Sequence, residues 1–207
     1  MTALEQIFEY RIVAILRGCP PERVPAIAGA LADGGIRLLE ITLNSDGALD
    51  AIREVVERLG NRLLVGAGTV LTAAEAESAI GAGAAFVLSP SIDTDTIRIT
   101  RQLGAVSIPG AFTATEILTA HRAGADLVKV FPASVGAGYF RDLRGPLSGI
   151  SLMPAGGINL ENIRSFRAAG AAAYGIGGAL VPAGQETGAE ALRGLRQRAG
   201  EFIKALA

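Results

Sequence analysis

Asp126-Leu127-Val128-Lys129-Val130-Phe131-Pro132 is the stretch from which both the fold and the chemistry of this chain can be inferred. It is typical of a buried strand that runs into a turn, with a single lysine near the carboxyl end. Burial of an ammonium group is costly, and desolvation lowers the pKa of a lysine towards neutrality. Lys129 is therefore a candidate amine nucleophile. The alternative is that its stem lies along the core while its ammonium group reaches water.

The choice of basic residues elsewhere supports a special role for Lys129. The chain has only one other lysine, Lys204 near the C-terminus, and it uses arginine at all its remaining lysine-or-arginine positions. A guanidinium group keeps its proton at physiological pH, whereas a buried amine can lose it. A lysine at this one apolar strand end indicates that the protein needs an amine that deprotonates.

Composition argues against several classes of protein. The formal net charge of −1 provides no basic face of the kind that binds nucleic acid. The apolar residues occur in short runs broken by Gly, Arg and Asp, so we expect no contact with a membrane. Residues 1–10 lack a basic segment followed by an apolar one, which argues against a signal peptide. Cys19 and His121 are the only residues of their types, so we expect neither a disulfide nor a histidine metal site, and a cytoplasmic location fits.

A repeating pattern extends along the chain. Short apolar runs predict eight strands, at Arg11–Leu16, Leu38–Thr42, Leu63–Ala67, Ala85–Leu88, Ala105–Ile108, Leu127–Val130, Ser151–Pro154 and Ala172–Ile176. Helical patterns lie between or after them, at Glu22–Ala32, Ala48–Leu59, Ala73–Ile80, Thr94–Leu103, Ala114–Arg122, Leu160–Ala168 and Ala189–Leu206, with a short helix at Tyr139–Arg144. The residues placed to cap these helices are Asp46, Thr72, Asp93, Thr113 and Asn159.

Glycine marks the ends of several predicted helices. Junctions such as Asp33-Gly34-Gly35 and Ala123-Gly124-Ala125 precede the next strand, as expected where a helix ends in a left-handed residue. Strand and helix alternate without a low-complexity break. The pattern predicts an α/β protein that folds as a single (β/α)8 TIM barrel domain over residues 1–207, the alternative being an open, doubly wound sheet.

In such a barrel the carboxyl ends of the strands meet at one mouth, so the polar residues at those ends form one candidate site. A neutral Lys129 would attack a ketone and form a protonated Schiff base, which accepts electrons when a neighbouring carbon–carbon bond breaks. Glu40, an acid within an apolar strand, is suited to carry protons because burial raises its pKa. Alternatively, Glu40 only forms an ion pair with Arg17.

Other residues at the predicted mouth suggest what the substrate carries. Arg17 is suited to bind the carboxylate of a 2-oxo acid through two parallel hydrogen bonds. Thr69 offers a hydroxyl group, although it could instead cap the next helix. The pairs Gly156-Gly157 and Gly177-Gly178 follow the last two strands, where barrels often bind phosphate on backbone N–H groups. Glycine pairs also serve close packing, so a phosphate site is one of two readings.

Six motifs, taken in order, are similar to those of one enzyme family. They are Ala14-Ile15-Leu16-Arg17-Gly18, Glu40-Ile41-Thr42-Leu43, Gly66-Ala67-Gly68-Thr69-Val70, Pro109-Gly110, Val128-Lys129-Val130-Phe131-Pro132-Ala133 and Pro154-Ala155-Gly156-Gly157-Ile158. Through them the chain resembles, from about Arg11 to its C-terminus, the class I 2-keto-3-deoxy-6-phosphogluconate and 2-keto-4-hydroxyglutarate aldolases. Close relatives that act on 2-keto-3-deoxy-6-phosphogalactonate belong to the same group.

The resemblance implies a homotrimeric (β/α)8 barrel that needs no metal or other cofactor. It implies that Lys129 forms a Schiff base with pyruvate and that Glu40 moves protons. Among the substrate-binding residues, Arg17 and Thr69 would hold the pyruvyl carboxylate, and Phe131 would lie beside the pyruvyl group. The full substrate-binding set that we expect is Arg17, Thr69, Asn44, Pro90, Phe131, Gly156, Gly157, Gly177 and Gly178.

Three positions depart from the gluconate enzymes. Those enzymes have an arginine where this chain has Asn44, a threonine where it has Ala155, and a serine near Ala179. Asn44 shifts carboxylate binding towards Arg17, Ala155 removes a hydroxyl that could sense the configuration of a substrate carbon, and Ala179 leaves the phosphate to the backbone. The run Leu43-Asn44-Ser45 instead looks like the phosphogalactonate branch.

We therefore expect reversible cleavage of a 2-keto-3-deoxy-6-phospho-aldonate, galactonate or gluconate, to pyruvate and glyceraldehyde 3-phosphate. One alternative is an aldolase that cleaves 4-hydroxy-2-oxoglutarate to pyruvate and glyoxylate. Another is a barrel that binds a sugar phosphate and forms no imine, whether as an enzyme of a different class or as a binding protein.

Overall fold

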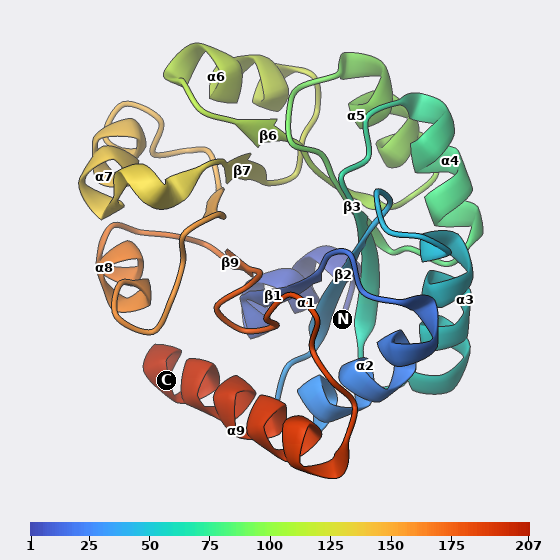
Figure 1. Cartoon of the computed structure of the whole chain (residues 1–207). Coiled ribbons are helices and arrows are strands. Elements are labelled where there is room, and N and C mark those ends of the chain that lie inside the picture. Colours follow the sequence, from blue (N-terminus) through green and yellow to red (C-terminus); the bar gives the residue numbers. More distant parts are fainter.

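The computed structural model describes all 207 residues and places the strands inside a ring of helices (Figure 1). The strands are β1 (Ile12–Leu16), β2 (Leu38–Thr42), β3 (Leu64–Gly68), β4 (Phe86–Leu88), β5 (Val106–Ile108), β6 (Gly110–Ala111), β7 (Val128–Val130), β8 (Leu152–Pro154) and β9 (Tyr174–Ile176). The helices are α1 (Ala3–Tyr10), α2 (Val24–Asp33), α3 (Ala48–Leu59), α4 (Ala73–Gly81), α5 (Thr94–Gln102), α6 (Ala114–Arg122), α7 (Ala137–Arg144), α8 (Ile163–Ala168) and α9 (Ala189–Leu206), with 3-10 turns η1 (Pro21–Arg23) and η2 (Ala133–Val135). All predicted strands and helices are present, and β6 and α1 are additional.

All strand pairs are parallel, and they form two hydrogen-bonded sheets. One has the order β5-β4-β3-β2-β1-β9 and the other has the order β6-β7-β8. The predicted strand Ala105–Ile108 corresponds to β5, and β6 follows it after Pro109, which has no N–H to donate to a ladder. The sheets still touch at both ends. Directly before β7, the Asp126 N–H donates to the Ser107 carbonyl of β5 at 3.0 Å, and directly after β8, Ala155 forms an isolated bridge with Gly175 of β9.

The arrangement of helices distinguishes between the two predicted architectures. An open, doubly wound sheet carries helices on both faces, whereas here α2 to α9 surround the strands on the outside (Figure 1). The fold is therefore α/β with a curled parallel sheet, and the doubly wound alternative is wrong.

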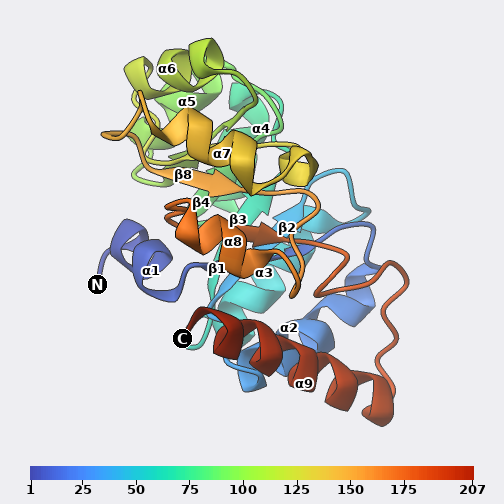
Figure 2. The same ribbon diagram turned by 90° about the vertical axis from the view of Figure 1, so that its left-hand side faces the viewer.

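Alternation along the strands divides the core into two layers. Inward-facing side chains such as Leu38, Phe86, Leu127 and Met153 form an inner cluster, while their neighbours pack outwards against the helices. Helix α1 contributes its buried Ile7 to the inner cluster. Figure 2 shows α1 to one side of the strands, where it covers one end of the inner core. The inner layer thus becomes polar only towards the opposite, carboxyl ends of the strands.

Helix capping agrees with the sequence at three of the five predicted positions, namely Thr72, Asp93 and Thr113. Asp46 is not a cap, because α3 begins after Gly47, which adopts the left-handed conformation with φ of +64°. Asn159 is not the cap of α8 either, since that helix begins after Asn162. Instead, the Asn159 side chain accepts the N–H groups of Glu161 and Asn162 at 3.0 Å in the preceding turn.

Candidate active site

Two ionisable side chains, Glu40 on β2 and Lys129 on β7, point into the inner layer of the core. Their strand neighbours Ile41, Val128 and Val130 belong to the outer layer, so the pleat turns the charged residues inwards. Glu40 is 1% exposed and Lys129 is 6% exposed. Both line the same cavity. Lys129 is therefore not a residue whose ammonium group extends to the outer surface.

The surroundings shift both side chains towards their neutral forms. Burial lowers the pKa of Lys129, against the opposing effect of the Glu40 charge. Burial raises the pKa of Glu40, although Lys129 and Arg17 act in the other direction. All six ion pairs of the chain use arginines other than Arg17, so the alternative of a Glu40–Arg17 ion pair is wrong. Glu40 Oε2 has no hydrogen-bond partner at all.

The Glu40→Gln variant should be more stable than the unaltered protein at neutral pH. A carboxyl whose pKa is raised by folding contributes stability below its unfolded pKa, near pH 4, and loses that contribution as the pH rises through the folded value. The amide removes this pH-dependent cost. Thermal unfolding followed by circular dichroism should show a higher Tm at pH 8, with the gain disappearing near pH 4. A gain that does not depend on pH would contradict the assignment of a buried, ionisable Glu40.

The cavity that contains both side chains has a volume of about 550 Å³. It is lined by Ile15, Arg17, Glu40, Lys129, Phe131, Ala155, Gly156, Gly157, Ile158, Asn159, Gly177, Gly178, Ala179, Val181 and Ala183. Eight of the predicted site residues are in this set: Lys129, Glu40, Arg17, Phe131, Gly156, Gly157, Gly177 and Gly178. The cavity therefore joins residues from β1, β2 and β7 to the loops that follow β8 and β9.

Three predicted site residues lie outside the lining of this cavity. Asn44 is exposed in the loop between β2 and α3. Pro90 follows β4, and its carbonyl oxygen lies against Gly110, where a Cβ would come within 2.4 Å. Thr69 directly follows β3 with a φ of +56°, which is unusual for a residue other than glycine. Thr72, not Thr69, caps α4, so the alternative role proposed for Thr69 is wrong.

Glycine at position 156 allows an aromatic wall to form beside the lysine. Lys129 Nζ lies 5.3 Å from the centroid of the Phe131 ring. Gly156 has a φ of +80°, and a Cβ on it would lie 2.9 Å from Cε2 of that ring. A side chain at position 156 would therefore displace Phe131 or strain the backbone. At Gly178, by contrast, a Cβ would meet nothing within 4 Å, so close packing does not account for that glycine.

Gly68 lies against the Glu40 carboxyl group and was not among the predicted site residues. It ends β3, and a Cβ there would lie 1.7 Å from Glu40 Oε1 and 2.4 Å from Glu40 Cδ. No side chain could coexist with the observed position of the Glu40 carboxyl group. The available signal was the alternation of β3, which places Gly66 and Gly68 on the same face as Glu40 in the neighbouring strand.

The apolar part of the lining was also not predicted. Ile15 is on β1, and Arg17 directly follows that strand, so the period of two places both side chains towards the inner face. Val181 and Ala183 belong to the loop after β9, where no periodic pattern exists to assign them. Ala155 and Ala179, noted as departures from the gluconate enzymes, do line the cavity.

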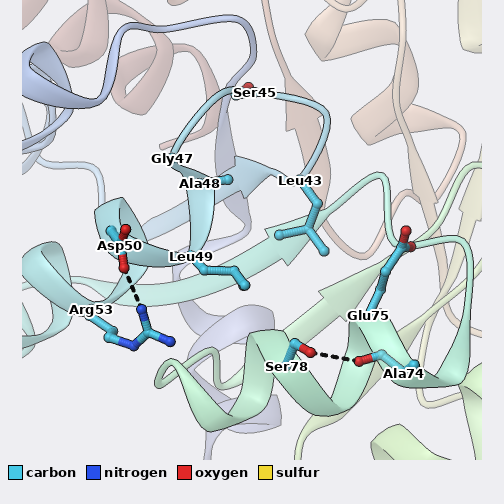
Figure 3. Close-up of a pocket in the computed structure, with 10 residues that line it drawn as sticks. All are labelled: Leu43, Ser45, Gly47, Ala48, Leu49, Asp50, Arg53, Ala74, Glu75 and Ser78. Carbon is cyan, nitrogen blue, oxygen red and sulfur yellow. Dashed lines mark hydrogen bonds and ion pairs between the residues drawn. The ribbon is translucent and has the colours of Figure 1, made fainter.

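A second cavity, of about 540 Å³, lies between the β2–α3 loop, α3 and α4 (Figure 3). Its polar side chains already form ion pairs or hydrogen bonds within the protein. Asp50 pairs with Arg53, Ser78 donates to the Ala74 carbonyl at 2.8 Å, and Glu75 belongs to the capping box of α4. This cavity has no buried, unpaired ionisable group, which distinguishes it from the Lys129 cavity.

Two further findings concern the molecule as a whole. The structure has no group of three or more His, Cys, Asp or Glu side chains placed to hold a metal ion. None of the helices combines the length and the apolar character needed to cross a bilayer.

Comparison with known proteins shows that this protein is an aldolase. The family model described as KDPG and KHG aldolase matches residues 4–193. The chain belongs to this family.

Among its relatives, the 2-dehydro-3-deoxy-6-phosphogalactonate aldolase of Escherichia coli (strain K12) is 37% identical over 196 residues, which cover 94% of this chain and 93% of the relative. A solved structure described as native KDPGal superposes with a TM-score of 0.87 at 36% identity, covering 94% of this chain and 93% of the other. A cube-shaped protein cage designed by fusing symmetric oligomeric domains superposes with a TM-score of 0.89 at 36% identity, covering 95% of this chain and 72% of the cage chain.

Proposed function

We propose that this protein cleaves 2-keto-3-deoxy-6-phosphogalactonate reversibly to pyruvate and glyceraldehyde 3-phosphate through a Schiff base on Lys129. The observation that carries this proposal is the pairing of a buried lysine with a buried carboxyl group at one cavity, with no ion pair to hold either in its charged form. An amine that is neutral in part of the molecules can attack a carbonyl carbon. Catalytic roles of this kind often accompany such pKa shifts.

The proposed reaction uses Lys129 and Glu40 in sequence. The Lys129 nitrogen attacks the C2 ketone to give a carbinolamine, which loses water to form a protonated imine. Removal of the C4 hydroxyl proton then breaks the C3–C4 bond, and its electron pair moves into the imine to give an enamine and the free aldehyde. Protonation of C3 and addition of water release pyruvate and restore the amine. Glu40 would carry the protons, because its raised pKa allows both forms to be reached.

The two ends of the substrate would bind at opposite sides of the cavity. Arg17 would hold the carboxylate, and Phe131 would lie against the pyruvyl group. Thr69, expected from the family resemblance to bind the carboxylate as well, is outside the cavity lining and would have to reach it from the end of β3. The phosphate would bind to the backbone at Gly156, Gly157, Gly177 and Gly178, and the open space at Gly178 supports this placement. Asn44 and Pro90 lie outside the cavity lining, so we assign carboxylate binding mainly to Arg17.

We propose that the protein prefers the galactonate epimer of the substrate to the gluconate epimer. Ala155 and Ala179 line the cavity without hydroxyl groups, and Asn44 stands where the gluconate enzymes have arginine. The 37% identity to the phosphogalactonate aldolase of Escherichia coli supports the same choice. Turnover of the two epimers should be compared side by side by coupled detection of pyruvate. A higher kcat/KM for the gluconate epimer would contradict the preference, and cleavage of 4-hydroxy-2-oxoglutarate alone would replace the proposed substrate class.

Closure of the barrel, the assembly of the protein and its location are proposed as well. We propose that residues 1–207 form a single closed (β/α)8 barrel, which the Asp126–Ser107 hydrogen bond and the Ala155–Gly175 bridge between the two sheets support. A homotrimer is proposed from the family resemblance, and similarity to a domain of a cage built from symmetric oligomers supports self-association. A cytoplasmic location is proposed from the single cysteine, Cys19.

A further inference from the structure

Hydroxyl groups connect the loop after β1 to the end of β2. The Gly18 N–H donates to Ser45 Oγ at 2.8 Å, and Ser45 Oγ lies 3.0 Å from Thr42 Oγ1. Thr42 Oγ1 donates to the Leu16 carbonyl oxygen at 3.2 Å. Thr42 is fully buried, and Ser45 is half-buried at the top of the β2–α3 loop (Figure 3).

The hydrogens in this connection can be assigned. A hydroxyl group has one hydrogen to donate, and Thr42 uses its own on Leu16. Ser45 must therefore donate to Thr42 while it accepts from Gly18. The result is a directed chain from the Gly18 N–H through Ser45 and Thr42 to the Leu16 carbonyl. The hydrogen bonds in such a chain strengthen one another where water is excluded.

We propose that Ser45 is a positioning residue for Arg17. The chain begins and ends on the two peptide groups that flank Arg17, because one holds the Gly18 N–H and the other holds the Leu16 carbonyl. The main chain on both sides of Arg17 is thereby fixed to β2, the strand that carries Glu40. Arg17 and Glu40 would then keep a constant spacing across the cavity.

The ladder between β1 and β2 ends at the pair Leu16 and Ile41, so it does not extend to Arg17 and Gly18. Arg17 is exposed and forms no ion pair. Gly18 has a φ of +60°, and a Cβ on it would meet nothing within 4 Å, so packing does not fix the chain there. The direction of the Arg17 side chain therefore depends on its main chain, which the hydroxyl groups hold beyond the end of the ladder.

The consequence for catalysis rests on the proposed function, in which Arg17 binds the substrate carboxylate. A guanidinium group that is already in place loses less conformational freedom when the carboxylate binds. Removal of the Ser45 hydroxyl should weaken binding and leave the chemistry at Lys129 unchanged.

The test is steady-state kinetics of the Ser45→Ala variant with the phosphogalactonate substrate. We expect KM to rise about tenfold, which corresponds to about 1.4 kcal/mol, while kcat stays within about twofold. Ser45→Thr keeps the hydroxyl group and should restore KM. In an Arg17→Ala background, Ser45→Ala should have no further effect on KM, because the residue it positions is absent.

The outcomes separate this inference from the proposed function. If the unaltered protein releases pyruvate but Ser45→Ala has an unchanged KM, the inference is wrong and the function stands. The inference is equally wrong if Ser45→Ala adds its full effect to Arg17→Ala, or if kcat and the circular dichroism signal fall together and Ser45→Thr does not restore them. If the unaltered protein releases no pyruvate from any 2-oxo acid tested, the proposed function fails, and this inference fails with it.

Discussion

Replacement of Lys129 by methionine should lower kcat/KM for pyruvate formation by at least about 10³-fold, since it removes the nucleophile itself. Methionine has a similar volume and suits the apolar surroundings, so the fold should be kept. Circular dichroism should show an unchanged spectrum, and the coupled pyruvate assay should show only the background rate.

The matched control for this variant is Lys204→Met. Lys204 is the other lysine of the chain, and it is exposed in the last turn of α9. Its replacement should leave kcat/KM within about twofold of the unaltered value. Substantial activity in Lys129→Met would instead point to a barrel enzyme that binds a phosphorylated metabolite and forms no imine.

The Gly68→Ala variant should lose activity because the added methyl group takes the place of the Glu40 carboxyl group. A Cβ at this position would lie 1.7 Å from Glu40 Oε1, so the carboxyl group must move by more than an ångström. A displacement of about 1 Å in a catalytic group can reduce the rate about 10²-fold, and we expect a fall of that size in kcat. The measurement is kcat at saturating substrate for Gly68→Ala and for Glu40→Gln.

A second glycine substitution separates this effect from a general loss of stability. Gly29 lies within α2, and a Cβ on it would meet nothing within 4 Å. Gly29→Ala should keep full activity and gain up to about 1 kcal/mol of stability from its helical position. If Gly68→Ala keeps the kcat of the unaltered protein, the assigned position of Glu40 is wrong.

The sequence was most informative where a period of two could be followed along a strand. Val128-Lys129-Val130 and Leu39-Glu40-Ile41 alternate apolar and ionisable side chains, so both ionisable groups had to face the side opposite to their neighbours. Burial of both groups, and hence the direction of their pKa shifts, could be predicted from this pattern alone.

Prediction was weaker where non-local geometry decides the outcome. Strand β6 was not predicted, because its two residues, Gly110 and Ala111, are too few to form an apolar run from which a strand can be inferred. Helix α1 was missed although Thr2 and Glu5 form a capping box, a local signal that was present in the sequence. Asn44 and Pro90 occupy loops after strand ends, and loop direction determines whether such residues reach the cavity.

The position of Gly68 against Glu40 could not be predicted from either residue alone. Its importance arises from the side chain of Glu40 on the neighbouring strand, and the pairing of β2 with β3 fixes that contact. The hydroxyl groups of Thr42 and Ser45 are a similar case, since their partners lie in the loop after β1. Both features depend on the register between strands.

The central claim is that the Lys129 amine forms an imine with pyruvate, and borohydride trapping tests it most directly. The unaltered protein should be incubated with pyruvate, reduced with sodium borohydride, digested and analysed by mass spectrometry. The account predicts one reduced pyruvyl group on the peptide that contains Lys129, and none in the Lys129→Met variant. Absence of any adduct, or an adduct confined to Lys204, would contradict it.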